Sequence, residues 1–427
     1  MLTSFRSLAR FCRVILLTAL TASAHGQRLS PLATAPDWAE LDRFQETITR
    51  EEFVRLLDEV YAPGGAARGL IEVQTDAAQI QTTLTPPARW TLRFAASRKE
   101  GRRPPRFWRT AGELGAAPAN RPLAGAKIAI DPGHIGGAWA RMEERFFQLE
   151  QGAPVTEGDM TLRVAELLAP VLRELGAEVS LVRSAAEPTT TARPEMLLDP
   201  ARAELVAQGG ADAAQRPAAV QSQSELLFYR SSEIRHRARV VNDTVKPDLT
   251  VCLHFNAEAW GDPRRPAFVP RNHLHLLVNG NYSASELRLD DVRFEMLIRL
   301  LERALPEEVA VSANVGAALA QRTQLPPYVY PFNNARRVGE SELIWARNLM
   351  ANRLYRTPVI FLEPYVMNSQ EVWERVQVGD YQGEKMVAGV LRKSIYREYA
   401  DAVAAGLASY FQAARARPTA GGVSPAR

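Results

Sequence analysis

Two short apolar segments of this sequence each end in a histidine. The segment Lys127–Asp131 leads through a Pro-Gly turn to His134, and Leu249–Leu253 leads directly to His254. The chain holds only six histidines, so this repeated placement is informative, and Glu157 stands between them at the head of an amphipathic segment. Two imidazoles and one carboxylate at strand ends predict a zinc site with three protein ligands and an open fourth position, which is the pattern of a hydrolase.

A second carboxylate that does not bind the metal is required by such chemistry, because a proton must move from the attacking water to the leaving group. Glu363 directly follows the apolar segment Pro358–Leu362 and is the predicted general base, with Glu371 as the next candidate. Asp131 is expected to orient the His134 loop as a hydrogen-bond acceptor, or else to cap the turn.

The elements that must position these residues alternate between strand and helix from Ala126 onward. This order predicts an α/β fold with a mostly parallel, twisted sheet flanked by helices, in which a ligand site lies beyond the carboxyl ends of the strands. The predicted strands are Lys127–Asp131, Glu178–Val182, Leu249–Leu253, Leu274–Val278 and Pro358–Leu362. The predicted helices are Asp159–Leu175 with a kink at Pro170, Ser231–Thr244, Arg288–Ala304 and Tyr396–Phe411.

Residues 1–24 have the pattern of a secretory signal peptide. Arginines precede the apolar run Val14–Leu20, and Ala22-Ser23-Ala24 provides a small-residue cleavage site. A membrane anchor is the alternative, and no later segment has the length and apolarity of a transmembrane span. We therefore expect export to the periplasm or cell envelope.

Charge and cysteine content disfavour other classes of protein. Residues 1–24 carry three arginines and no acid, so their removal reduces the formal net charge from +4 to +1. No basic stripe is interleaved with aromatic residues, so no nucleic-acid partner is expected. Cys252 then remains as the single cysteine, in an apolar strand, which favours an inert core thiol over a catalytic one.

The region before the α/β pattern predicts a small α+β module over residues 38–108. A helix begins after the cap residue Thr49, and Leu70–Gln74 and Trp90–Phe94 have the composition of strands. No catalytic constellation occurs in this module, so we expect a binding, docking or packing role. Residues 109–125, rich in alanine, glycine and proline, are predicted to be a linker.

Two polar stretches interrupt or follow the α/β pattern. Ser184–Gln223 is too long for an ordinary connection, and it predicts either a lid over the site or a solvated, disordered loop. Residues 413–427 are predicted to be a disordered tail.

Four motifs follow one another in an order that resembles a known family. Ile128–His134 resembles the opening motif of the zinc N-acetylmuramoyl-L-alanine amidases, of the catalytic-domain type found in bacterial cell-separation amidases. Glu157–Leu162 is similar to the second motif of that family, Arg237–Asn242 together with Asp248–Ala257 to the third, and Phe361–Glu371 to the segment with the catalytic glutamate.

The resemblance implies that residues 126–412 form a zinc amidase catalytic domain. It implies that Zn²⁺ is bound by His134, Glu157 and His254, with Glu363 as general base. The implied reaction is hydrolysis of the amide between the lactyl group of N-acetylmuramic acid and L-alanine, with peptidoglycan as substrate and an activator or divisome protein as partner. A zinc peptidase acting on stem or envelope peptides, and an inactive amidase-like scaffold that binds peptidoglycan, are the alternatives.

Some residue assignments stay open at the level of sequence. Glu143, Glu144 and Glu150 are rival metal ligands, although they stand in a charged run that is expected to be solvated. Asn256 is expected to contact substrate or to fix its own loop. Arg336 is expected to bind a carboxylate of the stem peptide or to be simply exposed.

Overall fold

The computed structural model describes residues 27–149, 151–259 and 267–416, so the predicted signal peptide lies outside the described residues. A mixed sheet of seven strands forms the centre, in the order β10-β11-β9-β12-β8-β4-β7. Its strands are β4 Lys127–Pro132, β7 Glu178–Leu181, β8 Leu249–Leu253, β9 Leu274–Val278, β10 Arg336–Arg337, β11 Ile344–Ala346 and β12 Val359–Pro364. The α/β fold with a mostly parallel sheet is therefore confirmed.

Strand direction decides which residues meet at the functional edge of this sheet. β4, β7, β8 and β12 run parallel to one another, with Ile128 beside Leu249 and Thr250 beside Val359. The carboxyl ends of β4, β8 and β12 therefore meet at one edge. β9 runs antiparallel to β12, and β11 is parallel to β9.

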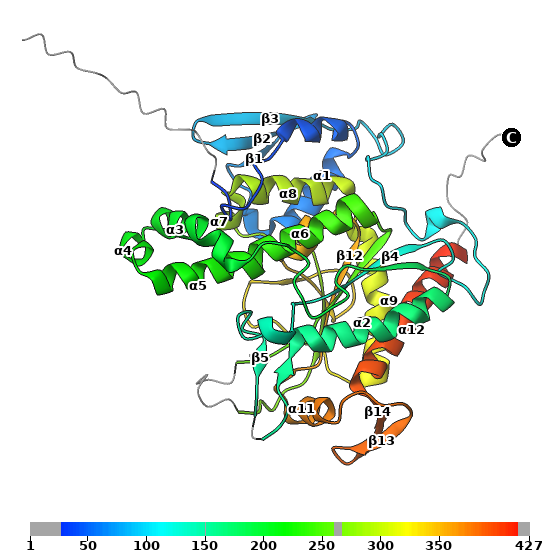
Figure 1. Cartoon of the computed structure of the whole chain (residues 1–427). Coiled ribbons are helices and arrows are strands. Elements are labelled where there is room, and N and C mark those ends of the chain that lie inside the picture. The colour runs from blue at the N-terminus through cyan, green and yellow to red at the C-terminus, as the bar shows by residue number, and fades with distance from the viewer. Residues whose placement is uncertain (1–26, 150, 260–266, 417–427) are drawn as a thin grey trace, which may run out of the picture.

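Helices cover both faces of the sheet. α2 (Glu157–Glu174), α9 (Leu305–Thr323) and α12 (Ile395–Ala416) pack on one face (Figure 1), and the main hydrophobic core lies between them and the strands. α6 (Glu233–Arg239) and α10 (Met350–Leu354) lie against the other face through a smaller cluster. α2 begins at Glu157 rather than Asp159 and continues through Pro170, and α12 extends to Ala416, so residues 413–416 are helical and not part of a disordered tail.

The N-terminal region forms an antiparallel sheet of β1 (Ile71–Val73), β2 (Ala77–Leu84) and β3 (Pro87–Arg93), with α1 (Arg50–Leu56) beside it. The Thr49 side chain accepts a hydrogen bond from the Glu52 amide, as the predicted cap requires. The core of this region is continuous with α8 (Asp290–Glu302) and with the inner residues of β9 and β11. Its contact with the rest of the chain is thus made of packed apolar side chains.

The segment Ser184–Gln223 is folded into helices in the structure. It contains η6 (Pro194–Leu197), α3 (Leu198–Ala207) and α4 (Ala211–Ala214), and α5 (Pro217–Leu227) begins within it. Helical geometry continues from α5 through η7 (Phe228–Ser232), α6 and η8 (Val240–Val245). Leu197, Ala201 and Val220 pack in one cluster with Ile135, which follows His134 in the chain. The segment is therefore a helical insertion that supports the His134 loop, and not a disordered loop.

The remaining elements are short. They are η1 Trp38–Phe44, η2 Leu57–Tyr61, η3 Pro63–Gly65, η4 Gly112–Leu114, η5 Gly137–Trp139, β5 Phe146–Phe147, β6 Val155–Thr156, α7 Ala284–Leu287, α11 Gln370–Gln377, β13 Glu384–Val387 and β14 Val390–Lys393. Within the predicted linker, Ala111 and Leu123 are buried in the main core. Among the described residues, no helix has the length and apolarity that a membrane span requires.

Candidate metal centre

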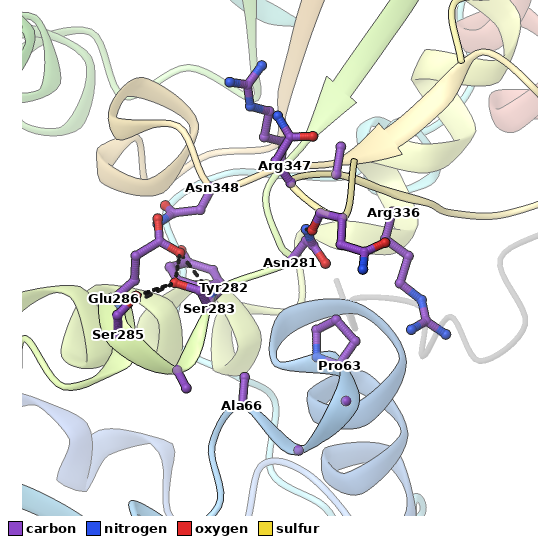
Figure 2. Close-up of a pocket in the computed structure, with 16 residues that line it drawn as sticks. Pro63, Ala66, Asn281, Tyr282, Ser283, Ser285, Glu286, Arg336, Arg347 and Asn348 are labelled. Carbon is purple, nitrogen blue, oxygen red and sulfur yellow. Dashed lines mark hydrogen bonds between the residues drawn. The ribbon is translucent and has the colours of Figure 1, made fainter. Parts of the chain in front are cut away.

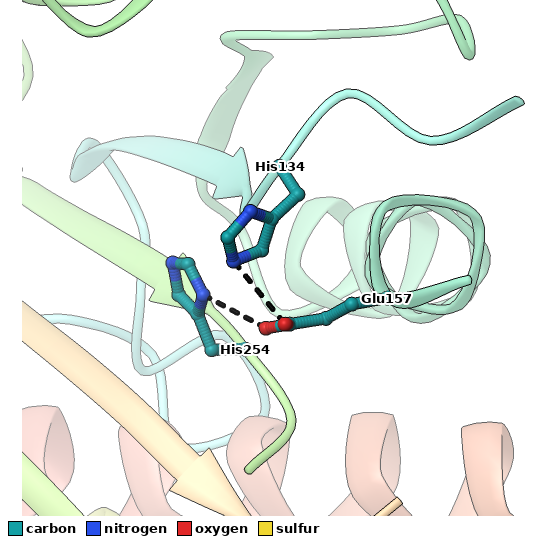
Figure 3. A group of neighbouring side chains, drawn as sticks. All are labelled: His134, Glu157 and His254. Atoms are coloured by element: carbon teal, nitrogen blue, oxygen red, sulfur yellow. Dashed lines mark hydrogen bonds and ion pairs between the residues drawn. The ribbon is translucent and has the colours of Figure 1, made fainter. Parts of the chain in front are cut away.

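The side chains of His134, Glu157 and His254 converge on one point (Figure 3). One ligand atom from each residue lies within 4.8 Å of the others. The Nε2 atom of His134 is 3.2 Å from one carboxylate oxygen of Glu157, and the Nδ1 atom of His254 is 3.0 Å from the other. Two imidazole nitrogens and a carboxylate oxygen form a donor set that suits Zn²⁺, so the chemistry of these residues fits the ion that the sequence implies.

The elements described above explain this convergence. His134 follows β4 and His254 follows β8, and these two strands are parallel neighbours. Glu157 is the first residue of α2, and its carboxylate also accepts a hydrogen bond from the Phe255 amide at 3.2 Å. Gly133 is necessary between β4 and His134, because a Cβ atom there would lie 2.2 Å from the His254 ring.

Glu143 supports His134 from the side opposite Glu157. This carboxylate is 4% exposed, accepts hydrogen bonds from the Ile135 amide at 2.8 Å and the Gly136 amide at 3.2 Å, and lies 3.7 Å from His134 Nδ1. The expectation that Glu143 is solvated is wrong, because the loop folds back over it. Glu144 is exposed, and Glu150 lies outside the described residues.

The three residues strongly shift one another's pKa values. Burial opposes the charged form of His134, but the Glu157 carboxylate and the hydrogen bond to Glu143 outweigh it and raise the His134 pKa to about 9. Burial also opposes ionisation of Glu157, yet the two histidines hold its pKa below the ordinary value. Burial lowers the pKa of His254, which favours the neutral ring that a metal requires.

Glu363 lies in the same cavity of about 400 Å³ as His134 and His254. It is inside β12 rather than after it, because the strand runs on to Pro364. Phe361, two residues earlier, stacks on the His254 ring at a centroid distance of 4.1 Å. Burial, followed by the negative charge of Glu157, raises the Glu363 pKa to about 8. A carboxyl group with a raised pKa in a cavity beside three candidate ligands is a candidate for proton exchange.

Asp131 acts on the His134 loop through Arg237. Its carboxylate accepts hydrogen bonds from Arg237 Nη1 at 2.9 Å and from the Tyr355 hydroxyl. Arg237 Nη2 donates in turn to the His134 carbonyl oxygen at 2.7 Å. Sequence reasoning placed Arg237 in a motif but gave it no role, because its partner lies on a strand far away in the chain.

Two predicted substrate contacts lie away from the cavity that contains Glu363. The Asn256 side-chain oxygen accepts a hydrogen bond from the Ala257 amide at 2.7 Å, so it fixes its own loop. Arg336 is exposed on β10 and lines a different cavity of about 960 Å³ (Figure 2). That cavity lies between the loop Pro63–Ala66 and the segment Asn281–Glu286, and polar and apolar groups contribute to its lining about equally.

Searches against known proteins gave structural similarity only. No protein-family profile and no curated protein matches this sequence. The N-acetylmuramyl-L-alanine amidase Ami1 from Mycobacterium smegmatis is 15% identical over 68% of this chain and 99% of its own, with a TM-score of 0.37. The CwlD amidase from Clostridioides difficile, solved in complex with the GerS lipoprotein, is 11% identical over 67% of this chain and 99% of its own, with a TM-score of 0.39. The amidase AmiC2 of Nostoc punctiforme is 15% identical over 68% of this chain and 99% of its own, with a TM-score of 0.36. Sequence identities and TM-scores this low do not support an assignment of function. That assignment therefore depends on the metal centre itself.

Proposed function

We propose that this protein is a zinc-dependent N-acetylmuramoyl-L-alanine amidase. The observation that carries the proposal is the convergence of His134, Glu157 and His254 at one sheet edge, with Glu363 in the same cavity. Three protein ligands with a separate carboxylate are the arrangement of catalytic rather than structural zinc sites.

The residues of the chain have separate roles in this reaction. His134, Glu157 and His254 would hold Zn²⁺, which when bound lowers the pKa of water and polarises a carbonyl group. Glu363 takes the proton of the attacking water and delivers it to the nitrogen of the leaving amine. Phe361 fixes the orientation of His254 by stacking, and the Asp131–Arg237 pair fixes the His134 loop.

The substrate is the amide between the lactyl group of N-acetylmuramic acid and L-alanine in peptidoglycan. The four motifs that include the converging residues support this choice, because they resemble those of amidases that cut this bond. An exported enzyme in the periplasm or cell envelope, controlled by an activator or divisome protein, is consistent with that substrate.

Mass analysis of material released from purified sacculi tests the proposal. The zinc-loaded protein should release stem peptides that begin at L-alanine and leave the glycan strands intact. Cleavage within the stem peptide would instead identify a zinc peptidase. Binding without any release would identify a scaffold.

A further inference from the structure

Arg347 lines both the cavity that contains Glu363 and the cavity of about 960 Å³, and it has no assigned role in the reaction. It follows β11, two residues after Trp345, whose side chain packs on the same sheet face as Phe361. Since side chains alternate along an extended chain, Arg347 belongs to the face that carries Phe361 and Glu363. In Figure 2 its guanidinium points away from the loop with Pro63 and Ala66.

The side-chain contacts of Arg347 lead to β9, the strand that pairs with β12 beside Glu363. Its Nη1 atom is 3.5 Å from the Tyr330 hydroxyl, which is 3.0 Å from His275 Nε2. His275 lies directly opposite Glu363 in the pairing of β9 with β12. The positive charge of Arg347 also counters, as a minor contribution, the effect of burial on the Glu363 pKa.

Arg347 differs from the other arginines of the cavity because it lacks an acidic partner. Arg145 pairs with Glu157 at 3.3 Å, Arg230 with Glu144 at 3.5 Å and Arg237 with Asp131 at 2.9 Å. Within the described ranges, no carboxylate oxygen lies within 4.0 Å of the Arg347 guanidinium. A half-buried guanidinium with only a neutral hydroxyl beside it is suited to an anionic ligand.

We propose that Arg347 binds the free α-carboxylate of the second stem-peptide residue, D-glutamate, in the leaving group. The inference rests on the proposed amidase function and names the substrate feature that this site selects. One residue separates D-glutamate from the scissile amide, so its carboxylate lies roughly 7 Å from the reacting nitrogen in an extended peptide. Arg347 thereby positions the leaving peptide, and amidation of the carboxylate removes the partner it requires.

Two small substrates that differ in one group test this role. They are N-acetylmuramoyl-L-alanyl-D-isoglutamate and the corresponding D-isoglutamine compound, in which the α-carboxylate is an amide. A charge-assisted hydrogen bond corresponds to a preference of roughly 10-fold to 100-fold, so the zinc-loaded protein should cleave the acid with a kcat/KM higher by that factor.

The variant Arg347→Gln should lose this preference, mainly through a higher KM for the acid, and should keep its kcat/KM for the amide. Arg347→Lys should retain part of the preference, because a single ammonium still attracts the carboxylate. Arg322→Gln, at an exposed position in the last turn of α9, is the matched control and should behave as the unaltered protein. Zinc content should be equal in all four proteins.

Two results would overturn the role of Arg347 and leave the proposed function intact. One is equal cleavage of the acid and the amide by the unaltered protein. The other is an equal loss on both substrates in Arg347→Gln with a shifted pH profile, since that result would mean that Arg347 only tunes Glu363. Failure of the zinc-loaded protein to cleave either compound or sacculi would instead overturn the proposed function.

Discussion

His254 is the ligand whose removal gives the clearest test of the metal centre. It contributes one of only two imidazole nitrogens, and its ring is held by both Glu157 and Phe361. The purified protein should contain about one zinc ion per chain, and His254→Ala should contain almost none. Metal analysis by mass spectrometry measures this directly. Glu144→Ala is the control, because Glu144 is exposed and should leave the metal content unchanged; equal zinc in the two variants would contradict the ligand assignment.

Glu363 can be tested separately from metal binding. Glu363→Gln keeps the shape of the side chain but cannot accept a proton, so hydrolysis should fall about 10²-fold to 10⁴-fold with zinc content unchanged. The comparison requires turnover measurements on zinc-loaded protein. Near-normal turnover would transfer the role to another carboxylate, and Glu371→Gln would then be the next variant.

At the scale of single residues, the sequence was informative where a side chain stands at the end of a strand or just beyond it. His134, His254 and Glu363 were predicted because parallel strands bring their carboxyl ends together. Glu143 and Arg347 were not assigned these roles, because their positions depend on how a loop folds back and on how β11 joins the sheet. Such placement results from long-range packing and leaves no local pattern in the sequence.

At the scale of elements, α6 is joined to the preceding loop by Glu233. The carboxylate accepts hydrogen bonds from the Thr189 and Thr190 amides at 3.1 Å and 3.0 Å and from Arg237 at 2.8 Å. Burial raises its pKa, but Arg237 and the two amides outweigh burial, so the net shift is downward. The folded protein thus holds this proton less tightly than the unfolded chain does.

The downward shift predicts how Glu233 contributes to stability at different pH. Its contribution is fully present above the unfolded pKa of about 4.3 and is lost as the pH falls through the lower folded value. Glu233→Gln should therefore reduce the free energy of unfolding by about 1–3 kcal/mol at pH 7, with a smaller difference in acid. Urea unfolding of the two proteins at a series of pH values measures this difference at pH 7 and in acid. A constant difference across the series would contradict this account.

The elements that sequence reasoning missed had weak local signals. β2 contains Ala77, Ala78 and two glutamines, and it is a strand because β1 and β3 pair with it on both sides. α9 lacked a clear pattern because valines and Gly316, which are weak helix formers, interrupt it. In both cases tertiary packing outweighs intrinsic propensity.

At the scale of the whole molecule, the N-terminal region and α8 share one apolar core. Phe53, Leu56 and Ile80 belong to the same cluster as Val292 and Met296 of α8. A variant that lacks residues 27–108 would expose this side of α8 to water, so we expect it to aggregate or to melt at a lower temperature than the full chain.

Solubility and thermal unfolding of the two proteins check this expectation. Arg89→Ala in the full chain is a suitable control, because Arg89 lies on the exposed face of β3. A soluble truncated protein with an unchanged melting temperature would show that the region is an independent unit with a docking role, as the sequence allowed.

The order of the strands also has a kinetic consequence. β4 pairs with β8, and β8 with β12, although each partner lies far along the chain, as the pairs Ile128–Leu249 and Thr250–Val359 show. Closing such large loops costs conformational entropy and slows folding, so we expect the ligands to meet late. A chain that is still extended, as during synthesis, would therefore lack the centre altogether. Metal capture and hydrolytic competence should then appear together, at the end of refolding, in a stopped-flow experiment.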